Sequence, residues 1–204
     1  YAGSISGAHA TGAVDGSGNN VGGLVGHSAG SSGSISDAYA TGTVNGTGND
    51  VGGLVGYNRG SISNSYATGA VTSAGNNVGG LTGLLDLGSV SNAYATGAVS
   101  SSNAAGVVGG LVGYNYSGSI SDAYATGNVS GSGINVGGLV GLNDGSIGAA
   151  HATGAVSGTT AVGGLVGRNS GSIGSSYAIG TATGTNDVGG LVGFNVGGTS
   201  SINN

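Results

Sequence analysis

The chain has 204 residues and a formal net charge of −5, with 51 glycines, seven acidic side chains and only two arginines, Arg59 and Arg168. Two cations cannot neutralise a phosphate backbone, so we expect no nucleic-acid partner, and the lack of an apolar run of about 18 residues argues against membrane insertion. The glycines have no three-residue period, which excludes collagen, and they stand beside Val, Leu and Ile at fixed positions, which favours a packed chain over a disordered one.

Two short motifs alternate along the whole chain. The first reads Val-Gly-Gly-Leu-(Val/Thr)-Gly and begins at Val21, Val51, Val78, Val108, Val136, Val162 and Val188. The second reads Tyr/His-Ala-(Thr/Ile)-Gly and begins at His9, Tyr39, Tyr66, Tyr94, Tyr124, His151 and Tyr177. A period of 26–30 residues is typical of a solenoid, in which each unit buries its apolar face on its neighbours.

We therefore predict one domain over residues 1–204, an all-β, single-stranded parallel β-solenoid (β-helix) of seven rungs. Because no distinct polar capping segment appears at either end, we expect the chain to be a fragment or the mature part of a longer array.

One unit shows how a rung is built, in chain order. Ser61–Ser63 is predicted to be a short strand, Asn64–Ser65 a bend and Tyr66–Val71 a second strand. A loop over Thr72–Asn77 leads to a third strand, Val78–Gly83, which is interrupted by its Gly-Gly pair.

Strand alternation assigns the two faces of this unit. Ala67, Gly69 and Val71 share one face, which we expect to point inward, while the Tyr, Thr and Ala between them face outward. Val78 and Leu81 have opposite parity, so both can point inward only if the glycines between them make a corner, as we predict.

Gly-Leu-Val-Gly at Gly23–Gly26, repeated together with Tyr-Ala-Thr-Gly, resembles the GLUG repeat. That family occurs in large secreted bacterial proteins, namely filamentous-haemagglutinin-like adhesins and some IgA-specific metallopeptidases, where the repeats are accessory. The resemblance covers all seven units, although Thr82, Ile179 and Ala182 depart from single columns. It implies a right-handed β-solenoid at a cell surface and no catalytic residue.

The residues themselves also argue against catalysis and metal binding. The chain has no Glu, and His9 and His151 stand in the same column five rungs apart, roughly 24 Å, while His27 belongs to another column. Asp37 and Asp122 share a column but lie three rungs apart, too far for paired carboxylates. We expect no enzyme, and no cofactor except, as a minor alternative, a structural calcium ion near Asp50, where the loop from Asn45 resembles a calcium-binding nonapeptide.

Three surface features are candidates for binding. The first is a Thr column, with further Thr residues two positions along, which resembles the ice-binding faces of unrelated solenoid antifreeze proteins; its members are Thr11, Thr41, Thr43, Thr68, Thr96, Thr126, Thr153 and Thr181. The second is an Asn column, which we expect to form an amide ladder inside a turn, with sugar binding as the alternative; its members are Asn58, Asn115, Asn143, Asn169 and Asn195.

The third candidate is the segment Leu84-Leu85-Asp86-Leu87, which replaces the usual turn in the third unit. Three leucines should not all fit into a filled interior, so we expect Leu84, Leu85 and Leu87 to form an apolar protrusion that contacts another protein.

These observations predict a non-catalytic structural or adhesive repeat segment of a secreted protein of the bacterial cell surface. Its expected partners are neighbouring repeats joined end to end and a host surface or polysaccharide. An ice-binding protein that uses the Thr/Ala face is the alternative, and a self-assembling extracellular fibre subunit is the third hypothesis.

Overall fold

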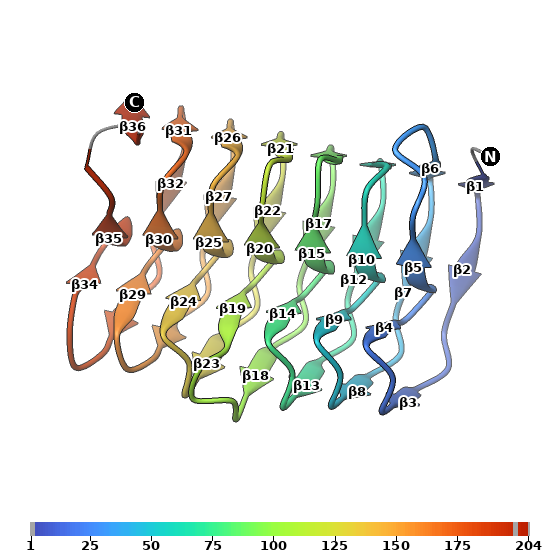
Figure 1. Ribbon diagram of the computed structural model, residues 1–204, viewed down its shortest axis with the longest axis horizontal. Helices are drawn as coiled ribbons and strands as arrows, with labels where there is room; N and C mark the ends of the chain where they lie inside the picture. Colours follow the sequence, from blue (N-terminus) through green and yellow to red (C-terminus); the bar gives the residue numbers. More distant parts are fainter. Residues whose placement is uncertain (1–2, 198–199, 204) are drawn as a thin grey trace.

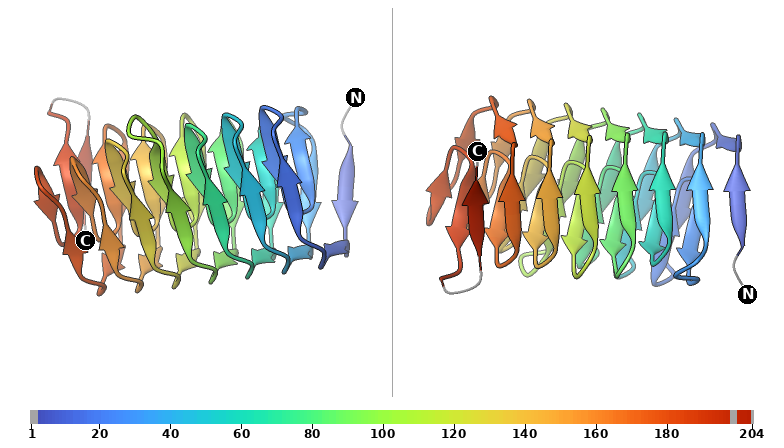
Figure 2. Two further views of the ribbon diagram at one scale, coloured as in Figure 1. Left: turned by 90° about the horizontal axis from the view of Figure 1, so that it is seen from below. Right: turned by 90° about the horizontal axis from the view of Figure 1, so that it is seen from above.

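The computed structural model describes residues 3–197 and 200–203 and shows a parallel β-solenoid whose axis follows its longest dimension (Figure 1). Within this part of the chain there is no helix, and so none that is long and apolar enough to cross a membrane. Strands of successive repeats lie side by side and pair in parallel in five sheets, as two turned views show (Figure 2). The predicted all-β solenoid of seven turns is therefore confirmed.

We number the sheets one to five in the order in which the chain visits them within a turn. Sheet one contains β1 (Ser4–Ser6), β6 (Ser34–Ser36), β11 (Ser61–Ser63), β16 (Ser89–Ser91), β21 (Ser119–Ser121), β26 (Ser146–Gly148), β31 (Ser172–Gly174) and β36 (Ser201–Asn203). Sheet two contains β2 (His9–Ala10), β7 (Tyr39–Ala40), β12 (Tyr66–Ala67), β17 (Tyr94–Ala95), β22 (Tyr124–Ala125), β27 (His151–Ala152) and β32 (Tyr177–Ala178). Sheet three contains β3 (Val14–Gly16), β8 (Val44–Gly46), β13 (Val71–Ser73), β18 (Val99–Ser101), β23 (Val129–Gly131), β28 (Val156–Ser157) and β33 (Ala182–Thr183).

The remaining two sheets carry the Val-Gly-Gly-Leu motif. Sheet four contains β4 (Asn20–Gly22), β9 (Asp50–Gly52), β14 (Asn77–Gly79), β19 (Val107–Gly109), β24 (Asn135–Gly137), β29 (Ala161–Gly163) and β34 (Val188–Gly189). Sheet five contains β5 (Val25–Ser28), β10 (Val55–Asn58), β15 (Thr82–Leu85), β20 (Val112–Asn115), β25 (Val140–Asn143), β30 (Val166–Asn169) and β35 (Val192–Asn195).

Two of the predicted element boundaries were wrong. The expected strand Tyr66–Val71 is broken into β12 and β13, because the chain bends at the Thr-Gly-Ala between them. Only glycine fits at the centre of this bend, since a Cβ on Gly69 would lie 1.9 Å from the carbonyl oxygen of Gly42 in the preceding rung. The expected loop Thr72–Asn77 is also shorter than predicted, because β13 extends to Ser73 and β14 begins at Asn77.

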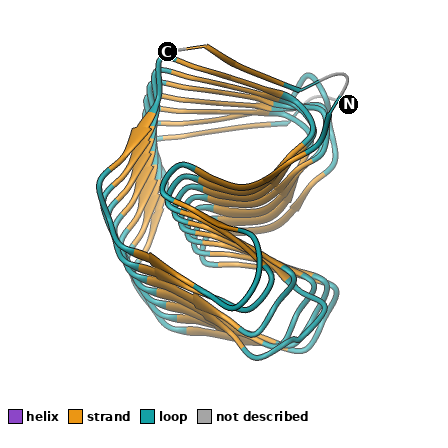
Figure 3. Cartoon of the chain, turned by 90° about the vertical axis from the view of Figure 1, so that its left-hand side faces the viewer, coloured by secondary structure: helices purple, strands orange, loops and turns teal. Residues whose placement is uncertain are grey.

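The interior is divided into two separate apolar cores, a division that is visible along the axis (Figure 3). The smaller core is made mainly of valines, such as Val71 and Val78, from sheets three and four. The larger core is enclosed by sheets one, two and five and includes Ile62, Ala67 and Leu81. The predicted inward positions of Val71, Val78 and Leu81 are confirmed, since none of these side chains is more than 1 % exposed.

A wall of backbone separates the two cores. The chain turns back after each Gly-Gly pair, so that sheets four and five lie against each other with glycine at the contact (Figure 3). A Cβ on Gly79 would lie 2.1 Å from the carbonyl oxygen of Thr82 and 2.7 Å from the backbone nitrogen of Gly113. The corner predicted at Gly79-Gly80 is therefore confirmed, and it lets Val78 enter one core while Leu81 enters the other.

The corner between sheets one and two uses the left-handed backbone region. Its residues recur in one column, and all have φ between 48° and 65°: Gly7, Asp37, Asn64, Asn92, Asp122, Ala149 and Ser175. Glycine, Asn and Asp tolerate this conformation best, which explains the turn chemistry expected from the sequence.

The buried Asn column forms the predicted amide ladder in its C-terminal half. Asn115, Asn143 and Asn169 each donate from Nδ2 to Oδ1 of the Asn one rung on, over distances of 2.7, 2.8 and 2.9 Å. Leu85 occupies the same column, fully buried, and interrupts the ladder. Asn58 therefore has no amide acceptor in the next rung, and its Nδ2 donates to the Gly60 carbonyl oxygen instead (2.7 Å). In the preceding rung Ser28 occupies the column, and the buried Oδ1 of Asn58, which would accept from that rung, has no hydrogen-bond partner within the described part of the chain.

A second polar column surrounds Asp50, whose side chain is only 7 % exposed. Asn77 Nδ2 donates to one carboxylate oxygen (2.7 Å). The Asn20 amide is oriented with its nitrogen toward Asp50, so that this nitrogen donates to the other carboxylate oxygen (3.1 Å). Burial raises the pKa of the Asp50 carboxyl above its ordinary value of 3.8, and the Asn77 hydrogen bond and the charge of His27 only partly oppose this.

The glycine wall is tested by Gly79→Ala. We expect this variant to lose more than about 4 kcal/mol of unfolding free energy or to fail to fold, because the added methyl group overlaps backbone atoms on two sides. Gly148→Ala is the matched control, since a Cβ there meets nothing within 4 Å, and its stability should change by less than about 0.5 kcal/mol. Equal denaturant midpoints for the two variants would contradict the backbone wall.

The Asp50 column is tested by Asp50→Asn. A raised folded-state pKa means that the folded chain binds the Asp50 proton more tightly than the unfolded chain, so its contribution to stability increases as the pH falls. We therefore expect Asp50→Asn to melt at a higher temperature than the wild type at pH 7, with the difference narrowing as the pH approaches 3.8. Asp122→Asn removes the same charge at an exposed position and should show no such pH-dependent gain.

Candidate functional site

Seven aromatic rings form one continuous stack on the outer side of sheet two. We call this stack the aromatic ladder, and its members are His9, Tyr39, Tyr66, Tyr94, Tyr124, His151 and Tyr177. Neighbouring ring centroids are 4.8–5.1 Å apart and the ring planes differ by 10° or less. Each ring covers the face of the next, so the ladder presents ring edges and hydroxyl groups to its surroundings.

The stack affects the acidity of its Tyr66 phenol. The pKa of Tyr66 is raised, first by desolvation in the stack and then by the neighbouring phenols of Tyr94 and Tyr39. The sequence placed this Tyr column on the outer face, which the structure confirms, but it did not indicate that the rings would stack face to face. Stacking could have been predicted from two observations: the aromatic residues occupy the same position in every repeat, and rungs are spaced roughly 4.8 Å apart.

The Thr column lies beside the ladder. Its backbone continues the parallel pairing, with the Thr68 N–H donating to the Ala40 carbonyl oxygen (3.0 Å), while the side chains point outward. Thr11, Thr41, Thr68, Thr96 and Thr126 are exposed, Thr153 is half-buried, and Thr43 and Thr181 are exposed in the neighbouring column. These two columns flank the bend between sheets two and three, so together they form an edge rather than one flat sheet face (Figure 3).

The leucine segment protrudes only in part, which corrects the expectation. Leu85 is fully buried in the larger core, and Leu84 is half-buried in the column that holds Tyr57 and Tyr114 in the adjacent rungs. Leu87 alone stands out, at 57 % exposed and with φ of 63°. The expected protrusion was wrong for Leu85, because the Asn column supplied an interior position that this side chain can fill. A contact of the segment with another protein stays a prediction.

Two tyrosine–carboxylate pairs lie along the column of Leu84. The Tyr57 hydroxyl donates to Asp86 (2.6 Å), and the Tyr114 hydroxyl donates to Asp144 (2.6 Å). Desolvation and the Asp86 hydrogen bond raise the pKa of Tyr57 to about 12. The pKa of Tyr114 is also raised, mainly by burial and secondly by the Asp144 hydrogen bond. The Arg59 Nε lies 3.3 Å from Asp86, so this carboxylate is occupied by two partners.

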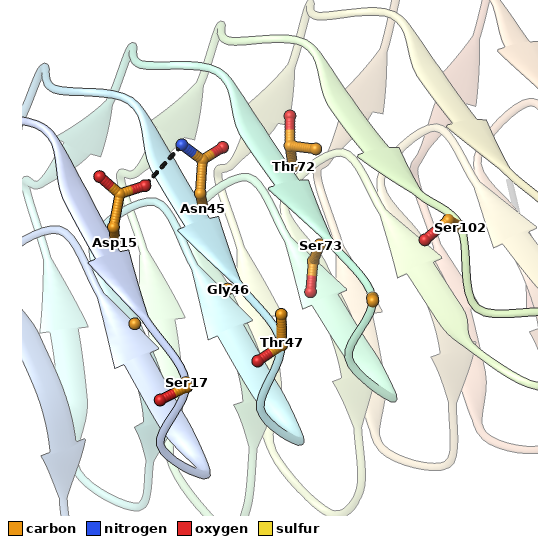
Figure 4. A pocket seen from close by; sticks show the side chains of 10 residues that line it. Asp15, Ser17, Asn45, Gly46, Thr47, Thr72, Ser73 and Ser102 are labelled. Atoms are coloured by element: carbon orange, nitrogen blue, oxygen red, sulfur yellow. Dashed lines mark hydrogen bonds between the residues drawn. The ribbon is translucent and has the colours of Figure 1, made fainter.

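Two of the surface hollows are lined mainly by Ser, Thr, Asn and Gly residues. One, of about 560 Å³, lies on sheet three, where Asp15, Asn45 and Thr72 stand in a row on successive strands (Figure 4). Asn45 Nδ2 donates to Asp15 Oδ1 (2.8 Å), so the only carboxylate of this hollow already accepts a hydrogen bond. A second hollow, of about 640 Å³, is lined by Leu87, Asp144 and several Ser and Gly residues. Neither lining includes a His or a cation that could act as a base or bind an anion.

The candidate metal ligands remain dispersed. His9 and His151 stand in one column with four tyrosines between them, and His27 packs edge-on against Tyr57 in another column. Across residues 3–197 and 200–203, no three His, Asp, Glu or Cys side chains gather closely enough to hold a metal ion. Near Asp50 both carboxylate oxygens already accept from amide groups, and amides rather than further carboxylates surround it.

The comparisons with known proteins agree with the repeat pattern. The GLUG motif family matches residues 17–45, 47–72 and 104–130. Each match covers one Val-Gly-Gly-Leu motif and the Tyr-Ala-Thr-Gly motif that follows it, together with the segment between them. Neither the curated proteins nor the solved structures gave a match. The chain thus carries GLUG motifs in three of its repeats, within a β-solenoid that runs through the described residues.

Proposed function

We propose that this chain is a non-catalytic structural and adhesive segment of a secreted protein at the bacterial cell surface. The observation that carries the proposal is the unbroken register of all five sheets along the axis. Each rung pairs only with its two neighbours, so the body can be lengthened by adding repeats without changing its cross-section. The extracellular location rests on the resemblance to GLUG repeats of secreted bacterial proteins.

Stiffness comes from columns of like residues inside and outside the coil. The valine core, the asparagine ladder and the aromatic ladder each connect several rungs through direct side-chain contacts. Bending the rod would have to break several of these columns at once. A segment of this kind suits a spacer that holds other domains away from a surface.

The adhesive role rests on repetition. The tyrosine and threonine columns present the same group in most rungs, at a rung spacing of roughly 4.8 Å, so a polymer with many weak contacts can bind along the axis. A polysaccharide or a host surface is the partner we propose. Ice is the alternative ligand of the Thr/Ala columns, but these columns meet at a bend and stand beside bulky rings, which favours the adhesive role.

Force spectroscopy tests the structural role. When the chain is pulled from its two ends, we expect rungs to detach one after another, because each contacts only its neighbours. Each step should release 26–30 residues, on the order of 90 Å of chain. A single event that releases the whole chain would mean that all rungs unfold together, as in a cooperative globular domain, and would contradict the proposal.

The choice between the adhesive and the ice-binding role is tested on the Thr column with Thr96→Tyr, which changes an exposed residue and should alter stability by less than about 0.5 kcal/mol. We expect the wild type to show no thermal hysteresis, and beads coated with it to be retained on a polysaccharide gel. If the wild type shows thermal hysteresis and the substitution abolishes it, the proposed adhesive role is wrong and the Thr column binds ice. Beads that are not retained, together with no hysteresis, would leave only the structural role.

A further inference from the structure

We propose that the run of four consecutive tyrosines in the aromatic ladder is an oxidative cross-linking site, where neighbouring rungs become joined by dityrosine. The run consists of Tyr39, Tyr66, Tyr94 and Tyr124. Their ring centroids are 5.0, 4.8 and 4.9 Å apart and the planes differ by only 4°, 1° and 5°. This inference does not depend on what the rod binds.

The geometry places the reactive carbons next to each other. All four side chains leave equivalent positions of sheet two, where Tyr66 pairs with Tyr39 on one side and with Tyr94 on the other. Neighbouring rings are parallel and related by one rung step. Each ring carbon ortho to the hydroxyl group therefore lies opposite the equivalent carbon of the next ring, on the order of one rung spacing away. Because the rings lie on the outer face and are only half-buried, ordinary side-chain motion on the picosecond-to-nanosecond timescale can bring them into contact.

The reaction needs a one-electron oxidant, for which we name hydrogen peroxide acting through a haem peroxidase. The oxidant removes the hydroxyl hydrogen atom from each of two phenols. The two tyrosyl radicals then form a carbon–carbon bond between positions ortho to oxygen. Each ring returns its ortho proton to its oxygen, which restores both phenols. In sum, two tyrosines and one hydrogen peroxide give one dityrosine and two molecules of water.

The other described tyrosines are placed less favourably. Tyr57 and Tyr114 are separated by Leu84, and both hydroxyl groups donate to carboxylates. Tyr116 meets Tyr114 edge-on, at 80°. Tyr177 is separated from the run by His151. The expected products are therefore the pairs 39–66, 66–94 and 94–124.

Each bond would close a loop of about one repeat. Such a loop restricts the unfolded chain, as a disulfide does, and should make the rod harder to unfold. This matters for a chain without cysteine, which has no disulfide available for the purpose.

The experiment treats the dilute chain with peroxidase and hydrogen peroxide and follows dityrosine fluorescence, chain mass and cross-linked peptides. We expect monomers that have lost two hydrogen atoms per bond, the three peptide pairs above, and a higher denaturant midpoint. The double variant Tyr66→Phe/Tyr94→Phe keeps the ring stack but removes every adjacent tyrosine pair of the aromatic ladder. Its fluorescence should fall to the level of the urea-unfolded wild type, while its circular dichroism stays unchanged.

A gain-of-function variant provides the matched control. His151→Tyr joins Tyr177 to the run, so new peptide pairs 124–151 and 151–177 should appear. The proposal is overturned if the double variant reacts as strongly as the wild type or if the folded chain gives no more product than the unfolded chain. It is also overturned if the product is found only between separate chains or only at Tyr114 and Tyr116.

Discussion

Most side chains of this solenoid have a residue of the same kind one rung away and must tolerate its proximity. The parallel pairing of successive rungs sets this constraint, because it places Ile62 between Ile35 and Val90, and Tyr66 between Tyr39 and Tyr94. Like charges at a spacing of roughly 4.8 Å would repel each other along the whole axis. The same constraint favours side chains that gain from stacking, such as valine, asparagine and tyrosine, and it accounts for a composition with only 4 % charged residues.

The glycines solve a second problem, which is how one chain encloses two cores. In the Val-Gly-Gly-Leu motif the valine enters the valine core and the leucine enters the larger core, so the intervening backbone becomes the wall between them. Side chains on that wall would hold sheets four and five apart. The high glycine content is therefore a packing requirement at these positions, and it does not indicate flexibility.

Departures from the repeat show how strongly the columns depend on one another. Leu85 is well buried, yet it interrupts the ladder, because it offers no acceptor to Asn58, whose Nδ2 donates to the Gly60 carbonyl oxygen of its own turn instead. Asp50 is accommodated differently, since the amides of Asn77 and Asn20 donate to it from both sides. A column thus accepts a foreign residue more readily when its neighbours can supply the complementary group.

The sequence by itself determined the period, the parallel solenoid, the inward positions of Val71, Val78 and Leu81, and the corner at Gly79-Gly80. These follow from local alternation and from the recurrence of each residue at a fixed phase. The division into two cores, the break of the strand after Ala67 and the burial of Leu85 were decided only by the tertiary structure. They depend on which sheets face each other across the coil, and one-dimensional periodicity carries no information about that. For the same reason the sequence showed an outward tyrosine column, while the contact between its rings required the register and side-chain orientation of neighbouring rungs.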